Sequence, residues 1–165
     1  MKPPVYSLVS LQAMIAANPA RWRPLVLTNG CFDLLHVGHL RYLQAARCLG
    51  RSLVVGVNSD QSVQALKPAL PGYPPRPIVP EQQRAELLAA LKPVDGVVIF
   101  EERTACQLIK TLQPEIYVKG GDYTLDTLPE APTVQAYGGQ IQLIAIEVPI
   151  STSALLDRIL LAHLS

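Results

Sequence analysis

The sequence predicts an α/β protein built on one doubly wound sheet of five parallel strands, with helices on both faces. Five short apolar runs recur along the chain, and segments with helical spacing of apolar residues separate most of them. Polar or glycine-rich residues follow several runs, at the sheet edge where parallel α/β proteins bind ligands. The expected strands are residues 25–27, 53–57, 94–100, 115–118 and 140–146. Because crossovers between parallel strands are right-handed, the architecture should be Rossmann-like.

Size and composition favour a single domain over residues 1–165. The chain has 165 residues, 49% of them hydrophobic, and its formal net charge is only +1. This balance offers no electrostatic footprint for nucleic acid, so a mononucleotide is the expected nucleotide partner. No apolar run is long enough to cross a membrane and the N-terminus lacks a signal-peptide core, which predicts a cytoplasmic protein without a membrane partner.

Residues 1–24 should form a helical lead-in that packs against the sheet. Residues 7–17 have a helical pattern with Ser7 as a candidate N-cap, and a segment from Pro19 to Pro24 leads into the first strand. That strand ends in a polar turn, Thr28-Asn29-Gly30, and helical spacing begins at Gly38.

Two histidines bracket the start of this helix. His36 and His39 lie three residues apart, next to backbone N–H groups that favour an anion, and Gly38 lets a nucleotide approach the backbone. Two imidazoles in this position suit a phosphate whose negative charge grows during reaction. The alternatives are that His36 caps the helix and His39 is a core histidine, or that the two bind zinc, for which no third ligand stands at usable spacing.

Cys31 is either a nucleophile or, more commonly, a small and partly buried thiol. The three cysteines form no C-x-x-C motif.

The second strand leads into a helix over residues 60–66 and then into a proline-rich loop, residues 67–80, which should lie over the site. Asn58-Ser59-Asp60 either contact a ligand or cap that helix. Lys67 and Arg76 are phosphate-directed cations or ordinary solvated charges. A further helix begins at Pro80-Glu81, and on it Arg84 points toward the nucleotide or pairs with Glu81.

Two later segments offer further polar groups at strand ends. After a helix over residues 104–112 and the fourth strand, Lys119-Gly120-Gly121-Asp122-Tyr123 allow a ligand close to the backbone, or form a plain tight turn. Ser151-Thr152-Ser153 precede a closing helix over residues 154–164 and suit the outer phosphates of a nucleotide, or act only as a cap.

Taken together, these motifs resemble a known family. HVGH preceded by NGCFD is similar to the H-x-G-H signature of the nucleotidyltransferase superfamily. With VNSD, RPIVPEQQR, VKGGDY and STS added, the resemblance covers nearly all of residues 25–160. It narrows to the D-glycero-β-D-manno-heptose 1-phosphate adenylyltransferases, the adenylyltransferase part of ADP-heptose synthase, with VKGGDY as the discriminating string. Glycerol-3-phosphate cytidylyltransferases read more like M-G-D-D-W there and carry an arginine before the final serine and threonine, which this chain lacks.

The resemblance implies that a sugar 1-phosphate attacks the α-phosphorus of ATP and expels pyrophosphate, with Mg²⁺ on the phosphates, in a homodimer. His36, His39 and Lys67 would be the catalytic residues, the lysine near the acceptor phosphate. No residue would be a dedicated metal ligand. The residues expected around the nucleotide are Asn29, Gly30, Cys31, Phe32, Asp33, Gly38, Arg84, Lys119, Gly120, Asp122, Ser151, Thr152 and Ser153.

Three departures from the family pattern qualify this resemblance, and the one in the loop after Lys67 bears on the acceptor. Gln82 replaces an acidic residue, the loop after Lys67 is longer and richer in proline, and Ser153 stands where a threonine is usual. The nearest alternative is therefore a cytidylyltransferase acting on glycerol 3-phosphate or a similar small phosphate compound. A non-catalytic nucleotide-binding module is the alternative from another class.

Overall fold

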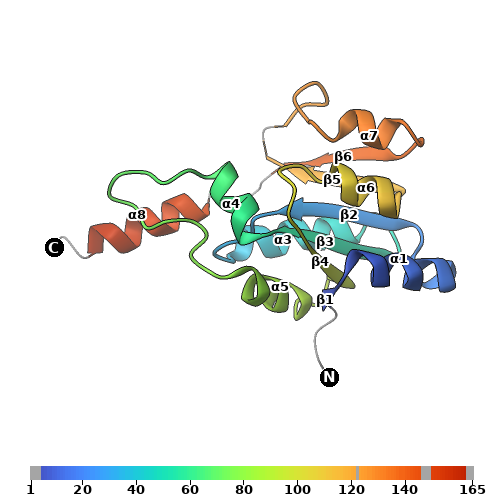
Figure 1. The fold of residues 1–165 in the computed structure, drawn as a ribbon, viewed down its shortest axis with the longest axis horizontal. Coiled ribbons are helices and arrows are strands. Elements are labelled where there is room, and N and C mark those ends of the chain that lie inside the picture. The colour runs from blue at the N-terminus through green and yellow to red at the C-terminus, as the bar shows by residue number, and fades with distance from the viewer. Residues whose placement is uncertain (1–4, 122, 146–149, 163–165) are drawn as a thin grey trace.

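The computed structural model describes residues 5–121, 123–145 and 150–162. Within these residues, six parallel strands form one sheet in the order β1-β4-β3-β2-β5-β6 (Figure 1). The strands are β1 (Val5–Tyr6), β2 (Leu25–Gly30), β3 (Ser52–Asn58), β4 (Gly96–Phe100), β5 (Ile116–Gly120) and β6 (Gln140–Ile144). The predicted parallel α/β architecture is confirmed, but the predicted number of five strands is wrong.

The additional strand is β1, which lies in the region predicted to be only a helical lead-in. Val5 and Tyr6 pair in parallel with Val97 and Val98 of β4. The Tyr6 ring packs edge-on against Trp22, with ring centroids 6.3 Å apart. A two-residue strand has no periodicity to detect, and only its tertiary partners define it.

Eight helices are described, and two of them were not predicted. They are α1 (Leu8–Ala17), α2 (Pro19–Trp22), α3 (Val37–Arg47), α4 (Asp60–Leu66), α5 (Glu81–Ala89), α6 (Cys106–Leu112), α7 (Ala131–Gln135) and α8 (Thr152–Ala162). The unpredicted α2 and α7 have four and five residues, too few for a clear helical pattern. Ser7 accepts a hydrogen bond from the N–H of Ser10, which confirms it as the N-cap of α1.

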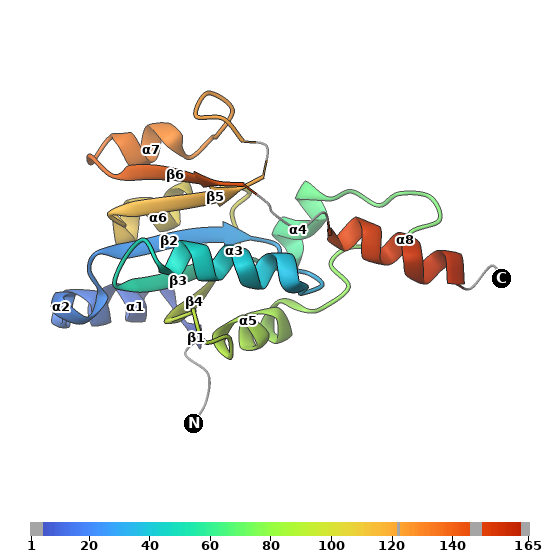
Figure 2. The same ribbon diagram turned by 180° about the vertical axis from the view of Figure 1, so that it is seen from behind.

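Two buried apolar clusters place the helices on opposite faces of the sheet (Figures 1 and 2). Helices α1, α6 and α7 cover one face, where Leu11 and Leu108 are almost fully buried. Helices α3 and α5 cover the other, with Leu43 and Leu88 at 0% exposure. Burial on both faces explains why the strands read as continuous apolar runs.

Several polar residues that were predicted to form turns belong to strands or helices. Gly30 pairs with Val57 of β3, so β2 runs through the expected Thr28-Asn29-Gly30 turn. Strand β5 likewise continues through Lys119 and Gly120. Helix α8 begins at Thr152, so two of the three hydroxyl residues lie within its first turn, and the predicted end of the fifth strand, at Ile146, falls outside the described residues.

The sheet order reverses between β2 and β5, whose carboxyl ends flank a crevice. Ligands of open α/β sheets bind at such a switch point. Helix α8 and the loop of residues 67–80 extend beyond this edge, away from the rest of the sheet (Figures 1 and 2). The loop contains neither helix nor strand, as its prolines predict. In the described part of the chain, no helix combines the length and the apolar character needed to cross a membrane.

Candidate active site

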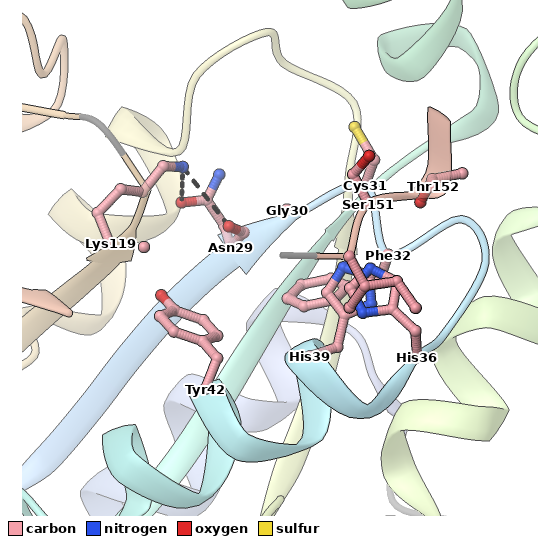
Figure 3. A pocket seen from close by; sticks show the side chains of 13 residues that line it. Asn29, Gly30, Cys31, Phe32, His36, His39, Tyr42, Lys119, Ser151 and Thr152 are labelled. Atoms are coloured by element: carbon pink, nitrogen blue, oxygen red, sulfur yellow. Dashed lines mark hydrogen bonds between the residues drawn. The ribbon is translucent and has the colours of Figure 1, made fainter. Parts of the chain in front are cut away.

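The turn between β2 and α3 brings the two predicted histidines together. His36 is the N-cap residue of α3 and its side chain makes no capping hydrogen bond. Its ring stacks on that of His39, with centroids 3.8 Å apart and an interplanar angle of 24°. Phe32 lies beside the pair (Figure 3), with its ring centroid 5.3 Å from that of His39, and has a left-handed backbone conformation with φ of 47°. Such strain in a bulky residue is typical of functional sites.

The Nδ1 nitrogens of the two imidazoles have no hydrogen-bond partner in the described part of the chain. In both His36 and His39 this atom is buried. Burial, reinforced by the neighbouring His36, lowers the pKa of His39 to about 4, and burial also lowers the pKa of His36. Both rings are therefore neutral near pH 7 in the free protein, and an arriving phosphate would favour their protonated forms.

Close packing around His36 favours glycine at position 38. A Cβ atom at Gly38 would lie 3.0 Å from Nδ1 of His36 and 3.2 Å from Cγ2 of Ile150. Ile150 lies two residues before Thr152, where α8 begins, so Gly38 allows the start of α3 to lie close to the start of α8.

A cavity of about 260 Å³ opens between these two helix starts (Figure 3). The hydroxyl of Ser151 accepts a hydrogen bond from the N–H of Ala154 and so caps α8. The cavity is lined by Asn29, Gly30, Cys31, Phe32, His36, Gly38, His39, Tyr42, Lys119, Gly120, Ile150, Ser151 and Thr152. Eleven of these are predicted site residues, and Tyr42 and Ile150 are additions. Tyr42 lies one helical turn after His39, a spacing that could have revealed it.

The end of β5 closes the crevice on its other side. The Lys119 ammonium donates to Oδ1 of Asn29 at 3.1 Å, and the Tyr117 hydroxyl donates to the same oxygen. Burial lowers the pKa of Lys119. A Cβ atom at Gly120 would lie 2.9 Å from the Tyr42 ring, so glycine keeps this floor of the cavity flat. Asp122, also predicted for the site, lies outside the described residues.

A larger cavity of about 720 Å³ shares the histidine edge of the first. Both cavities are lined by Asn29, Gly30, Cys31, Phe32, His39, Lys119, Ser151 and Thr152. The larger one adds the predicted residues Asp33, Lys67 and Ser153. It also adds Thr104, Tyr123 and Glu130, among others, which were not assigned to the site from the sequence. Two ligands can therefore meet next to His39.

Arg84 does not line either cavity, which differs from the predicted contact with the nucleotide. Its side chain is 0% exposed, and its guanidinium donates to the carbonyls of Val79, Cys31 and Asn58 and to the carboxylate of Asp60. The suggested pairing with Glu81 is wrong, because Glu81 accepts from the N–H of Asp60 instead. Arg84 thus holds the loops around the site.

Asp33 has a comparable structural role, although it also lines the larger cavity. Its buried carboxylate accepts from the N–H groups of Ile78 and Val79 at 2.8 and 2.9 Å, and from the Arg76 guanidinium. Arg76 is therefore paired, whereas Lys67 forms no ion pair in the described part of the chain.

Ser59 caps α4 and accepts a hydrogen bond from the N–H of Ser62, which favours the capping interpretation of Asn58-Ser59-Asp60.

The chemistry of Cys31 fits a passive thiol. Burial is the main influence on the Cys31 thiol and raises its pKa, although Lys67 and Arg84 act in the opposite direction. A protonated thiol is a weak nucleophile. No group of three or more histidine, cysteine or acidic side chains that could hold a metal ion occurs among the residues that the structure describes.

Comparisons with known proteins agree with this geometry. The model of the cytidylyltransferase-like family matches residues 27–160. The chain is 49% identical over 151 residues to bifunctional protein HldE of Syntrophotalea carbinolica, covering 92% of the chain and 30% of that protein. It is 46% identical over 159 residues to the HldE protein of Geobacter sulfurreducens, covering 96% of the chain and 31% of that protein. The chain thus spans about a third of the length of these curated relatives.

Solved structures show the same fold. A lipopolysaccharide core biosynthesis protein from Thermoplasma volcanium has 29% sequence identity and a TM-score of 0.59, over 74% of this chain and 94% of that one. Pantothenate synthetase from Thermus thermophilus has 18% identity and a TM-score of 0.54, over 87% of this chain and 61% of that one. At that identity the second likeness concerns the fold alone.

Proposed function

Because this chain belongs to the cytidylyltransferase-like family, we propose that it transfers AMP from ATP to D-glycero-β-D-manno-heptose 1-phosphate, giving ADP-heptose and pyrophosphate. The observation that carries the proposal is the stacked pair of His36 and His39, whose Nδ1 atoms have no hydrogen-bond partner among the described residues. His39 lines both cavities, and His36 lines the smaller one. The identity to HldE proteins and the VKGGDY motif support the choice of nucleotide and sugar.

In this reaction an oxygen of the sugar 1-phosphate forms a bond to the α-phosphorus of ATP, and the bond from that phosphorus to the oxygen bridging to the β-phosphorus breaks. Pyrophosphate leaves with the bond electrons. His36 and His39 would donate hydrogen bonds to phosphoryl oxygens as negative charge develops, and the hydroxyls at the start of α8 would hold the outer phosphates. Lys67 would hold the acceptor phosphate. Alignment and electrostatic stabilisation carry such a step without a covalent intermediate.

Nucleotidyltransferases that use ATP generally need a divalent metal, and we propose Mg²⁺ bound to the triphosphate. The ion would neutralise the charge of the leaving pyrophosphate. Mg²⁺ is usually held by substrate phosphates with few protein ligands.

We also propose a single cytoplasmic domain and a homodimer. Sedimentation velocity that detects only monomer would contradict the dimer.

The test is pyrophosphate release in Mg²⁺ with ATP and CTP, each offered separately with the heptose 1-phosphate and with glycerol 3-phosphate. Turnover with ATP and the heptose alone is expected. Turnover only with CTP and glycerol 3-phosphate would replace the adenylyltransferase by the cytidylyltransferase. ATP binding with no turnover of any pair would favour a non-catalytic nucleotide-binding module.

A further inference from the structure

The larger cavity has a buried carboxylate in its wall that packing alone does not explain. Glu130 is 2% exposed, and its Oε1 atom accepts a hydrogen bond from the N–H of Ala105 at 3.1 Å. Its Oε2 atom is buried and has no hydrogen-bond partner among the residues that the structure describes. Glu130 also forms no ion pair in the described part of the chain. Burying a carboxylate is costly unless its oxygens accept hydrogen bonds, so the free oxygen requires a donor.

The residues near Glu130 on the cavity wall indicate what kind of donor this is. The charge of Glu130 raises the pKa of Lys119, opposing the lowering by burial, so the two groups influence each other electrostatically. The Lys119 ammonium lies 5.4 Å from the centroid of the Tyr123 ring, and Thr104 adds a hydroxyl to the same cavity. A carboxylate, a lysine, a hydroxyl and an aromatic face together offer acceptors, donors and an apolar surface, which suits a ring carrying several hydroxyls.

A phosphate group is a poor occupant of this part of the cavity, because the Glu130 carboxylate would repel its charge. The same cavity contains Lys67, which forms no ion pair within the described residues and is the better partner for a phosphate. The cavity therefore contains both cations that favour an anion, such as Lys67 and Arg103, and a buried carboxylate that favours hydroxyl donors.

We propose that Glu130 is a specificity-determining residue whose free oxygen accepts hydrogen bonds from acceptor hydroxyls, so that the enzyme selects a polyhydroxylated sugar phosphate. This inference rests on the proposed function and deepens it. Sites built to bind a hydroxyl discriminate strongly against analogues that lack it, because the buried polar group is then left unpaired.

The first test is the substitution Glu130→Gln in the full chain. The amide keeps the size of the side chain and one oxygen for the Ala105 N–H, and it replaces only the free oxygen. We expect kcat/KM for the heptose 1-phosphate to fall about 10-fold or more, mainly through KM, with the KM for ATP within about twofold. Glu101→Gln is the matched control, because Glu101 is exposed and lines neither cavity, and it should behave like the wild type.

The second test compares acceptors that each lack one hydroxyl. At least one deoxy acceptor should lose about 10-fold or more in kcat/KM with the wild type and little with E130Q. Equal losses in both proteins for every deoxy acceptor would overturn the proposal, as would unchanged acceptor kinetics in E130Q. If E130Q does not fold, the variant Glu130→Asp replaces it, because the shorter side chain keeps the charge but moves the carboxylate oxygens away from the acceptor. Wild-type acceptor kinetics in this variant would assign Glu130 to a structural role at the start of α6.

Failure of the proposed function is a separate outcome. It appears as absence of wild-type turnover with ATP and the heptose, and the Glu130 tests then use whichever acceptor the wild type does adenylylate or cytidylylate. A true acceptor without free hydroxyls would overturn the inference.

Discussion

Two polar clusters meet at the turn between β2 and α3, and they differ in how much of their hydrogen-bonding capacity the protein itself uses. The first is the histidine pair, whose Nδ1 atoms form no hydrogen bond with any described residue. The second is the network around Arg84 and Asp33, in which one guanidinium makes four hydrogen bonds and one carboxylate binds two backbone N–H groups and a second guanidinium. Unused hydrogen-bonding capacity in a buried group indicates a ligand site. A group whose hydrogen bonds are all made within the protein indicates a structural role, and we call the Arg84 and Asp33 network the scaffold.

This difference separates residues that the family resemblance had placed together. Arg84 and His39 both belong to motifs associated with the nucleotide, yet only His39 lines the cavities. Substitutions on the two sides should therefore have opposite signatures. Substitutions in the scaffold should lower stability, and substitutions of the histidines should lower turnover.

Arg84→Met should give the largest effect, on the scaffold side. The substitution removes an ion pair and takes the guanidinium donors away from three carbonyls, of which that of Asn58 is buried and the other two are partly buried. The free energy of unfolding should therefore fall by about 3–5 kcal/mol. Urea denaturation measures this loss. Arg41→Met, at an exposed position of α3, is the control and should change stability little. Wild-type stability with selective loss of ATP binding in R84M would assign Arg84 to the ligand and break the comparison.

His39→Ala should give the largest effect on the ligand side. Loss of a donor to the transition state should lower turnover by about 10²- to 10³-fold. ATP affinity should stay within several-fold of wild type, because stabilisation confined to the transition state does not contribute to ground-state binding. Pyrophosphate release and calorimetric titration measure the two quantities, with Gln44→Ala on the exposed face of α3 as the control. A parallel fall in binding and turnover would make His39 a ground-state ligand.

Asp33→Asn should have a smaller effect on the scaffold side. The amide keeps one acceptor but loses the charge that pairs with Arg76, so we expect a loss of about 1.5–3 kcal/mol in unfolding free energy. Residues 67–80 should also become more sensitive to limited proteolysis, because Asp33 holds Ile78 and Val79. Asp126→Asn, at an exposed position, should change neither measurement. Unchanged proteolysis in D33N would argue that the loop is held elsewhere.

The pH dependence of stability should show the smallest effect, on the histidine side. Because the pKa of His39 is lowered to about 4, the unfolded chain binds a proton there between about pH 6.5 and pH 4 that the folded chain does not. The folded state should therefore lose stability as the pH falls through this window. His39→Gln removes the contribution and should lose less between about pH 7 and pH 4.5 in urea denaturation. Equal losses in both proteins would show that the His39 pKa is not lowered.

The local sequence pattern predicted elements correctly where the signal lies within a few neighbouring residues. The apolar runs of β3 and β4 and the Ser7 cap of α1 could be read from neighbouring residues, since each depends on spacing or on a local hydrogen bond. Strand β1 could not, because two residues carry no period and their partner lies about ninety positions away in β4. The ends of β2 and β5 were misjudged because glycine and asparagine usually mark turns, whereas here ladder pairing extends the strands through them.

By itself, the sequence determined the α/β class, the family and the pairing of His36 with His39, because three-residue spacing at a helix start is a local property. Only the tertiary structure decided which polar residues are free to act. Whether Arg84 meets a ligand or three carbonyls, and whether Glu130 has a partner for its second oxygen, depends on segments that are distant in the chain. A residue type fixes how many hydrogen bonds a side chain can make, but the fold fixes which of them the protein leaves for a ligand.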